Sequence, residues 1–155
     1  MRRTDREILN MDEILEIINK CDVCRLALFD EEYPYIIPMN FGFEYQNQRI
    51  IIYLHCANEG KKLELIYKNK KVSFEMDCSH KLIQGNKPCD CTMEYESVIG
   101  NGIIEIMKDN KEEALTALMK HYSKVEIFTF SDKMLLATTT LKITVEKITA
   151  KRLKK

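Results

Sequence analysis

Three strand-like segments follow one another in the first half of the chain with only short turns between them. They are Arg25–Phe29, Tyr35–Tyr45 and Arg49–His55. Parallel neighbours need a crossover of about a dozen residues or more, whereas antiparallel neighbours can be joined by a tight turn. The connections, residues 30–34 and 46–48, are too short for such a crossover. This spacing disfavours a doubly wound parallel sheet and predicts an antiparallel one.

The rest of the chain adds further strand patterns and short helical ones. Alternating apolar residues and β-rich composition predict strands over Lys71–Asp77, Thr92–Met107 and Thr138–Ile148. Apolar spacing and capping patterns predict helices over residues 10–20, 60–69 and 110–122. Polar residues with Gly85 and Pro88 predict a loop over 79–90. Six strands and three short helices indicate an α+β protein, mainly β, built around a barrel or strongly curled sheet.

Composition narrows the class of protein. The 155 residues carry 24 basic and 24 acidic side chains and 45% hydrophobic residues, which suits one globular domain over residues 1–155. A balanced charge argues against a nucleic-acid partner. No apolar run is long enough to span a bilayer, and the charged N-terminus lacks a signal-peptide core. We therefore expect a cytoplasmic protein with no membrane partner.

The six cysteines leave one alternative open. Cys21 and Cys24, together with Cys89 and Cys91, would supply four thiolates for zinc. Structural zinc pairs, however, are usually separated by two to four residues, and only one residue separates the second pair. Ordinary reduced thiols are the favoured interpretation, so we predict no metal site.

The stretch YLHCANEGKKLELI, residues 53–66, combines a strand end with a helix start. The first turn of a helix has unpaired N–H groups and the positive end of the helix dipole. Lys61 and Lys62 are electrostatically unfavourable there unless an anion binds, and a phosphate is the usual anion. Gly60 would let the backbone come close to it. The alternative is two solvated lysines on an ordinary helix.

A second feature is a proline within a predicted strand. Pro38 lacks a backbone donor, so neighbouring backbone groups leave the strand ladder. Exposed strand N–H and C=O groups can contact the polar edge of a planar heterocycle, with Met39 packed on its face. A barrel edge strand with a harmless proline is the alternative.

Taken together, these segments resemble the pyridoxamine 5'-phosphate oxidase-like flavoproteins, and more closely their 5-nitroimidazole-resistance (Nim) branch. The matching segments are CRLA (24–27), PYIIPMNFGFEY (34–45), YLHCANEGKKLELI (53–66), NKKVSFEMD (69–77), CTMEYESVIGNGIIEI (91–106) and LKITVEKITAKRLKK (141–155). Lys70 stands where the family often has proline. The match runs in order along nearly the whole chain.

The resemblance implies a six-stranded antiparallel split β-barrel with short flanking helices, a homodimer, and FMN at the subunit interface. Lys61 and Lys62 would hold the FMN phosphate. The residues implied to bind FMN are Pro38, Met39, Asn40, His55, Cys56, Ala57, Lys61, Lys62, Tyr95 and Ser97. Tyr95 and Ser97 would face the flavin of the partner subunit. A cation beside the flavin ring would come from Arg25 or from Lys151 and Arg152.

Some positions depart from the vitamin B6 oxidases of this family. Ile37 and Gly42 stand where those enzymes carry basic residues, and Lys61 replaces an arginine. The substrate-binding tail of those enzymes has no counterpart in the 155 residues. We therefore do not expect oxidation of vitamin B6.

The Nim branch implies an FMN-dependent oxidoreductase that passes electrons from reduced FMN to a small molecule, such as a nitroaromatic compound. His55 is the candidate catalytic residue, because an imidazole can donate a proton near neutral pH. Packing and hydrogen bonding are its alternative role. A flavin carrier or sensor without nitroreductase turnover is the alternative function, and a thiol-based metal or redox protein rests on the cysteines alone.

Overall fold

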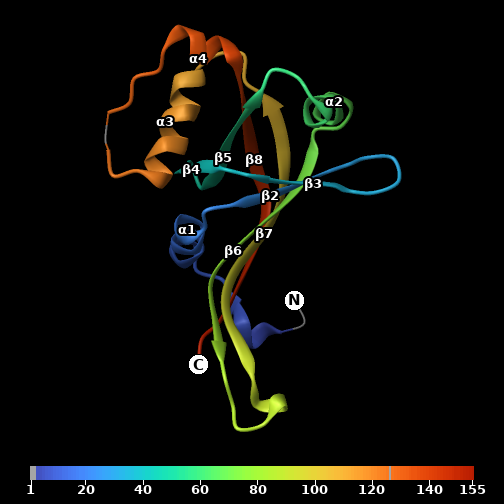
Figure 1. Ribbon diagram of the computed structural model, residues 1–155, viewed down its shortest axis with the longest axis vertical. Helices are drawn as coiled ribbons and strands as arrows, with labels where there is room; N and C mark the ends of the chain where they lie inside the picture. Colours follow the sequence, from blue (N-terminus) through green and yellow to red (C-terminus); the bar gives the residue numbers. More distant parts are fainter. Residues whose placement is uncertain (1–2, 126) are drawn as a thin grey trace.

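The computed structural model describes residues 3–125 and 127–155 (Figure 1). Its strands are β1 (Glu7–Ile8), β2 (Cys24–Leu28), β3 (Tyr35–Met39), β4 (Phe41–Gln46), β5 (Arg49–Ala57), β6 (Lys71–Ile83), β7 (Thr92–Ile106) and β8 (Thr138–Leu153). Its helices are α1 (Met11–Lys20), α2 (Lys61–Lys68), α3 (Lys111–Tyr122) and α4 (Asp132–Ala137), with 3-10 turns at Thr4–Arg6 and Pro88–Asp90.

All strand pairs in the sheet are antiparallel, in the order β3-β2-β6-β7-β8-β5-β4, with β1 beside β8. The predicted α+β, mainly β fold is confirmed. The predicted number of six strands is wrong, because the described residues form eight. One extra strand is β1, which is too short to show a pattern. The other arises because the segment predicted as one strand, Tyr35–Tyr45, divides at Asn40.

The division at Asn40 closes the sheet into a barrel. β3 and β4 are the two ends of the strand order, yet only Asn40 separates them in the chain. Consecutive Cα atoms are about 3.8 Å apart, so the two ends of the sheet must meet at this residue. Pro38 and Met39 therefore lie at the seam of the barrel.

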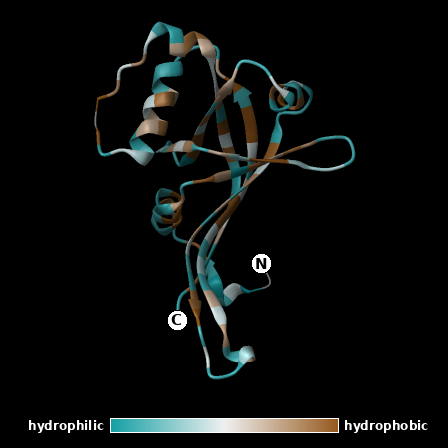
Figure 2. Cartoon of the chain, viewed as in Figure 1, coloured by the Kyte–Doolittle hydropathy of each residue, from teal (hydrophilic) through white to brown (hydrophobic). Residues whose placement is uncertain are grey.

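β6, β7 and β8 extend beyond the barrel as a long arm (Figure 1). The predicted loop over residues 79–90 is wrong in its first part, because β6 continues to Ile83 after an irregularity between Cys78 and Lys81. Ser79 has a positive φ of 58° at that point. Side chains of this part of β6 are largely exposed, so no alternation marks it as a strand. The loop at the tip of the arm is hydrophilic (Figure 2).

The helices pack against the strands of the barrel. Asn10 caps α1 through its side-chain oxygen, which accepts a hydrogen bond from the Asp12 N–H at 2.8 Å. α3 lies on β4 and β5, and a Cβ at Gly42 would come within 2.4 Å of the Ala117 backbone. Gly42 therefore permits close helix packing. α3 starts as predicted, but Asn110 makes no side-chain cap.

None of the helices in the described parts of the chain is long and apolar enough to cross a membrane.

Candidate functional site

The turn between β5 and α2 leaves an open helix start. Gly60 precedes α2 with φ 129° and ψ 163°, and no side chain caps the helix there. Its carbonyl oxygen accepts hydrogen bonds from the N–H groups of Leu63 and Glu64, at 2.9 and 3.4 Å. The N–H groups of Lys61 and Lys62 come before these and have no helical acceptor.

Space is available in front of this helix start. Apart from its neighbours in the chain, a Cβ built on Gly60 would have no described atom within 4 Å. The positive φ of Gly60 is a backbone conformation that residues other than glycine adopt rarely. An anion can therefore approach the backbone here without displacing a side chain, which is the arrangement that favours phosphate at a helix N-terminus.

The two lysines at this helix start have different neighbours. Lys61 Nζ lies 2.6 Å from an Asp30 carboxylate oxygen and 5.1 Å from the ring centre of Tyr35. The hydrogen bond to Asp30 raises the pKa of Lys61 and lowers the pKa of Asp30. Lys62 Nζ instead donates to the Met39 sulfur at 3.1 Å. Within residues 3–125 and 127–155, no carboxylate forms an ion pair with Lys62.

Lys62 joins the end of β5 to the barrel seam. It touches Met39, the last residue of β3, and Met39 is buried. The Lys62 charge also acts on His55 and Cys56 at the end of β5. The structure therefore brings together four of the residues predicted to bind FMN, with Ala57, Asn40 and Pro38 next to them in the chain.

His55 is a half-buried imidazole. Burial and the nearby Lys62 charge lower its pKa below the ordinary value of 6.5, so the neutral form predominates at pH 7. Burial raises the pKa of the Cys56 thiol, and Lys62 opposes that shift. Cys56 is therefore a thiol at neutral pH.

Two buried polar atoms on this face have no described partner. His55 is directly opposite Thr140 across β5 and β8, and directly opposed side chains in an antiparallel pair lie on the same face. Neither His55 Nδ1 nor Thr140 Oγ1 has a hydrogen-bond partner in the described residues. Buried polar atoms usually have one, so this end of β5 can accommodate a polar ligand or a water.

Tyr95 and Ser97 lie elsewhere in the same chain. At the barrel end of β7, Ile106 is opposite Leu141, which in turn is opposite Leu54 beside His55. Nine positions along β7 separate Ser97 from Ile106, roughly 30 Å at 3.4 Å per residue. One chain therefore does not bring these two residues to Lys62.

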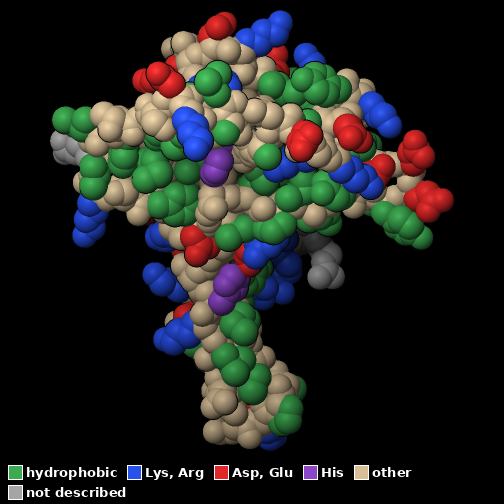
Figure 3. Space-filling view, turned by 45° about the horizontal axis from the view of Figure 1, so that its top comes forward, with side chains coloured by type: hydrophobic (Ala, Val, Ile, Leu, Met, Phe, Trp, Pro, Cys, Tyr) green, Lys and Arg blue, Asp and Glu red, His purple; other side chains and the backbone are tan. Residues whose placement is uncertain are grey.

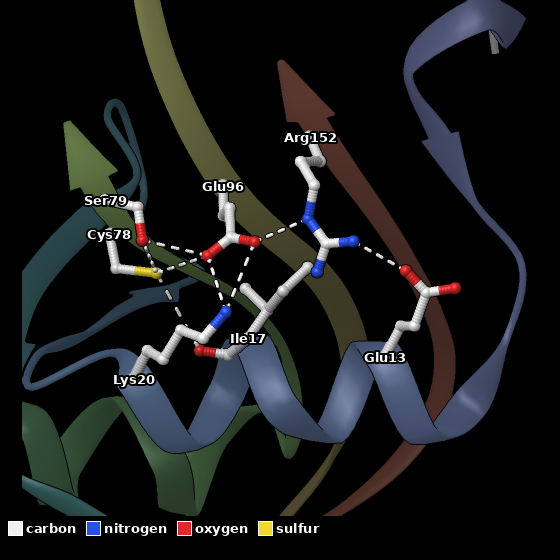
Figure 4. A network of polar contacts seen from close by, with 7 residues as sticks. All are labelled: Glu13, Ile17, Lys20, Cys78, Ser79, Glu96 and Arg152. Carbon is white, nitrogen blue, oxygen red and sulfur yellow. Dashed lines mark hydrogen bonds and ion pairs between the residues drawn. The ribbon is translucent and has the colours of Figure 1, made fainter. Parts of the chain in front are cut away.

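Two of the three basic residues expected beside the flavin ring, Arg25 and Arg152, are paired with acids. Arg25 Nη1 lies 3.1 Å from Glu75 and also contacts Asp77. Arg152 binds Glu96 at 2.5 Å and Glu13 at 2.6 Å (Figure 4). Both guanidinium groups therefore have structural partners within the chain.

Glu96 is the centre of that second set of contacts (Figure 4). It is buried and accepts hydrogen bonds from Ser79 at 2.9 Å and from Lys20 at 3.1 Å as well as from Arg152. Burial would raise the pKa of Glu96, but these hydrogen bonds lower it to about 2. The set ties α1 to the arm. A cavity of about 100 Å³ beside it is lined in part by Tyr95.

The cysteines do not gather into a metal site. Cys21 and Cys24 are buried, and burial raises the pKa of both thiols, that of Cys24 to about 12. Cys89 and Cys91 are exposed near the tip of the arm. Among the described residues, no group of three or more His, Cys, Asp and Glu side chains is arranged to hold a metal ion.

Sequence reasoning missed Asp30 and Thr140. Asp30 is one of three consecutive acidic residues in a turn, and nothing in the sequence singles it out as the partner of Lys61. Thr140 belongs to a run of three threonines, and only its register opposite His55 gives it significance.

Charge on the surface is mixed. Figure 3 shows basic and acidic side chains interspersed among apolar groups on the face drawn there, without a large area of one sign. This distribution agrees with the balanced total of 24 basic and 24 acidic residues.

Comparison with known proteins gives a consistent result. Residues 10–152 match the family model described as pyridoxamine 5'-phosphate oxidase. A candidate 5-nitroimidazole antibiotic resistance protein from Bacteroides thetaiotaomicron is 33% identical, with a TM-score of 0.82 over 94% of this chain and 86% of that one. Among curated protein sequences, none matches significantly.

Two further solved structures share the fold at lower identity. An FAD- and heme-binding protein from Mycobacterium smegmatis is 15% identical, with a TM-score of 0.82 over 97% of this chain and 74% of that one. A candidate pyridoxamine 5'-phosphate oxidase from Listeria innocua is 21% identical, with a TM-score of 0.57 over 93% and 98% of the two chains.

Proposed function

Because the chain belongs to the pyridoxamine 5'-phosphate oxidase family, we propose that it is an FMN-dependent oxidoreductase that reduces a small acceptor of the nitroaromatic class. The observation that carries the proposal is the open helix start at Gly60, where Lys62 has no acidic partner in the described residues. The 33% identical protein from Bacteroides thetaiotaomicron supports the choice of acceptor.

The cofactor phosphate would bind at Gly60, Lys61 and Lys62. Two N–H groups without helical acceptors, the positive end of α2 and the Lys62 ammonium all favour a doubly charged anion at this position. Met39 would pack beside the ring system from the barrel seam, with Pro38 and Asn40 supplying backbone atoms. When bound, FMN would supply the two-electron redox chemistry, which the protein positions and tunes.

His55 is the proposed catalytic residue. At neutral pH its lowered pKa favours the neutral imidazole, which offers one N–H donor and one acceptor. As a hydrogen-bond donor it would orient the acceptor molecule. Cys56 and Ala57 would complete the wall of the site at the end of β5.

A homodimer would complete the site. Ser97 lies roughly 30 Å along β7 from the barrel end, so Tyr95 and Ser97 would reach a flavin only on a second subunit. The outer face of the sheet also carries exposed apolar residues: Ile36 is 62% exposed and Ile99 54%. Exposed apolar residues gathered on one sheet face favour association with another surface.

Anaerobic reoxidation tests the activity. The FMN-loaded protein is reduced with dithionite and then mixed with a 5-nitroimidazole while the flavin absorbance is followed. A nitro group that takes up two electrons and two protons becomes a nitroso group and water, so the absorbance of oxidised flavin should return in proportion to the acceptor added. A reduced flavin that is not reoxidised by nitro compounds would contradict the proposal and favour the role of a flavin carrier or sensor. The same experiment with the FMN-loaded His55→Ala variant shows whether the imidazole affects the rate of flavin reoxidation.

A further inference from the structure

Asp30 sits beside the proposed phosphate site and is the one described acid paired with Lys61. Asp30 lies in the turn between β2 and β3, whereas Lys61 begins α2, so the contact joins parts of the chain that are 31 positions apart. The Asp30 side chain is 24% exposed and that of Lys61 53% exposed. The pair is thus accessible to a solute anion.

A phosphate at Gly60 would need the same ammonium group. Lys61 follows Gly60 directly, and apart from the chain neighbours of Gly60 no described atom lies within 4 Å of a Cβ built on it. An ammonium group can serve two anions, but a carboxylate and a dianionic phosphate that share it repel each other. Lys61 is therefore divided between an internal acid and the incoming ligand, whereas Lys62 is not.

We infer that Asp30 is an internal competitor for the flavin phosphate, which sets cofactor affinity by holding Lys61 at 2.6 Å until the phosphate displaces it. This inference rests on the proposed FMN site. It assigns to Asp30 a role in the exchange of cofactor: the chain would bind FMN as a dissociable cofactor. The effect is confined to ligands that carry a phosphate.

Neighbouring groups hold the Asp30–Lys61 pair in place. Lys61 Nζ lies 5.1 Å from the Tyr35 ring centre, which favours a cation at that place. The Glu31 N–H donates to the Asp30 carboxylate at 2.9 Å and fixes its orientation. The turn that contains Asp30 therefore orients its carboxylate toward Lys61.

Titration of FMN and riboflavin into wild-type and Asp30→Asn protein tests the inference. Because exposed ion pairs contribute modestly, the variant should bind FMN about three- to tenfold more tightly, with a larger gain at low salt. Riboflavin, which lacks the phosphate, should bind both proteins equally. Glu32→Gln is the matched control, because it removes one exposed acid from the same turn and Glu32 forms no described ion pair with Lys61. It should leave the FMN affinity within twofold of wild type, a margin of about 0.4 kcal/mol.

Each other result overturns the inference. Unchanged or weaker FMN binding by Asp30→Asn would show that Asp30 does not compete. An equal gain for riboflavin, or an equal gain in Glu32→Gln, would assign the effect to the turn or to net charge. If wild-type protein prefers FMN over riboflavin while Asp30→Asn changes nothing, only this inference fails. If neither protein binds FMN, the proposed function fails with it. Circular dichroism melting of each variant confirms that it is folded.

Discussion

At the scale of single residues, Lys61 and Lys62 show how neighbours in sequence acquire different roles. Lys61 Nζ lies 2.6 Å from a carboxylate oxygen, whereas the one acceptor that Lys62 has among the described residues is a thioether sulfur, which is weak. An ammonium group next to a weak acceptor has the most to gain from a phosphate. Lys62 is therefore the principal charge for the proposed cofactor, and Lys61 the secondary one.

Replacement of Lys62 should weaken FMN binding more than replacement of Lys61. We expect Lys62→Met to raise the FMN dissociation constant about tenfold or more, because it removes a hydrogen bond from a charged group. Lys61→Met should have a smaller effect, since that lysine is shared with Asp30. Fluorescence titration measures both, with riboflavin as the ligand that should not respond. Equal losses for the two variants would contradict the difference in their roles.

At the scale of elements, the sequence predicted a helix over residues 60–69, within one residue of α2 (Lys61–Lys68) at each end, because all its determinants are local. The strand end, Gly60 and the apolar spacing of α2 lie within one short stretch. β3 pairs with β2 and β4 with β5, and these two hairpins lie at opposite ends of the strand order because β2 pairs with β6 and β5 with β8. That long-range pairing leaves no local pattern, so the sequence predicts one strand over Tyr35–Tyr45. The continuation of β6 to Ile83 was missed because its side chains are largely exposed and leave no apolar alternation, whereas most of β7 and β8 was predicted.

Side-chain contacts between distant parts of the chain were likewise not predictable from local sequence. Asp30 and Thr140 enter the candidate site only through tertiary contacts or register, and a single sequence records neither. His55 and Lys62 were predicted because they lie on the same local motif. Of the three residues expected to supply a cation, Arg25, Lys151 and Arg152, the two arginines are paired with acids on neighbouring strands and on α1.

The contacts of Glu96 should make stability depend on acid pH. Its folded-state pKa of about 2 lies below the ordinary value of 4.5, so its contribution is present above about pH 4.5 and is lost as pH falls toward 2. Glu96→Gln should therefore lower the melting temperature at pH 7 and flatten its decline between pH 5 and 3. Glu105→Gln, an exposed acid on the same strand with a 3.6 Å contact to Lys142, is the control and should change little. A parallel pH profile for Glu96→Gln and wild type would show that Glu96 does not carry this effect.

At the scale of the whole molecule, the proposed function requires two chains and bound FMN. The barrel seam and α2 would hold FMN at one end, and the arm would carry Tyr95 and Ser97 toward a second subunit (Figure 1). The exposed apolar residues Ile36 and Ile99 lie on the sheet face that such a partner would cover. Cofactor binding and dimer formation are therefore expected together.

Sedimentation velocity, recorded both at the flavin absorbance and at the protein absorbance, tests this most directly. With FMN in slight excess, we predict one flavin per chain that sediments with a particle of twice the 18.2 kDa mass of one chain. Riboflavin at the same concentration should sediment with the protein to a much smaller extent. FMN that remains unbound while the protein sediments as a single chain would contradict the account.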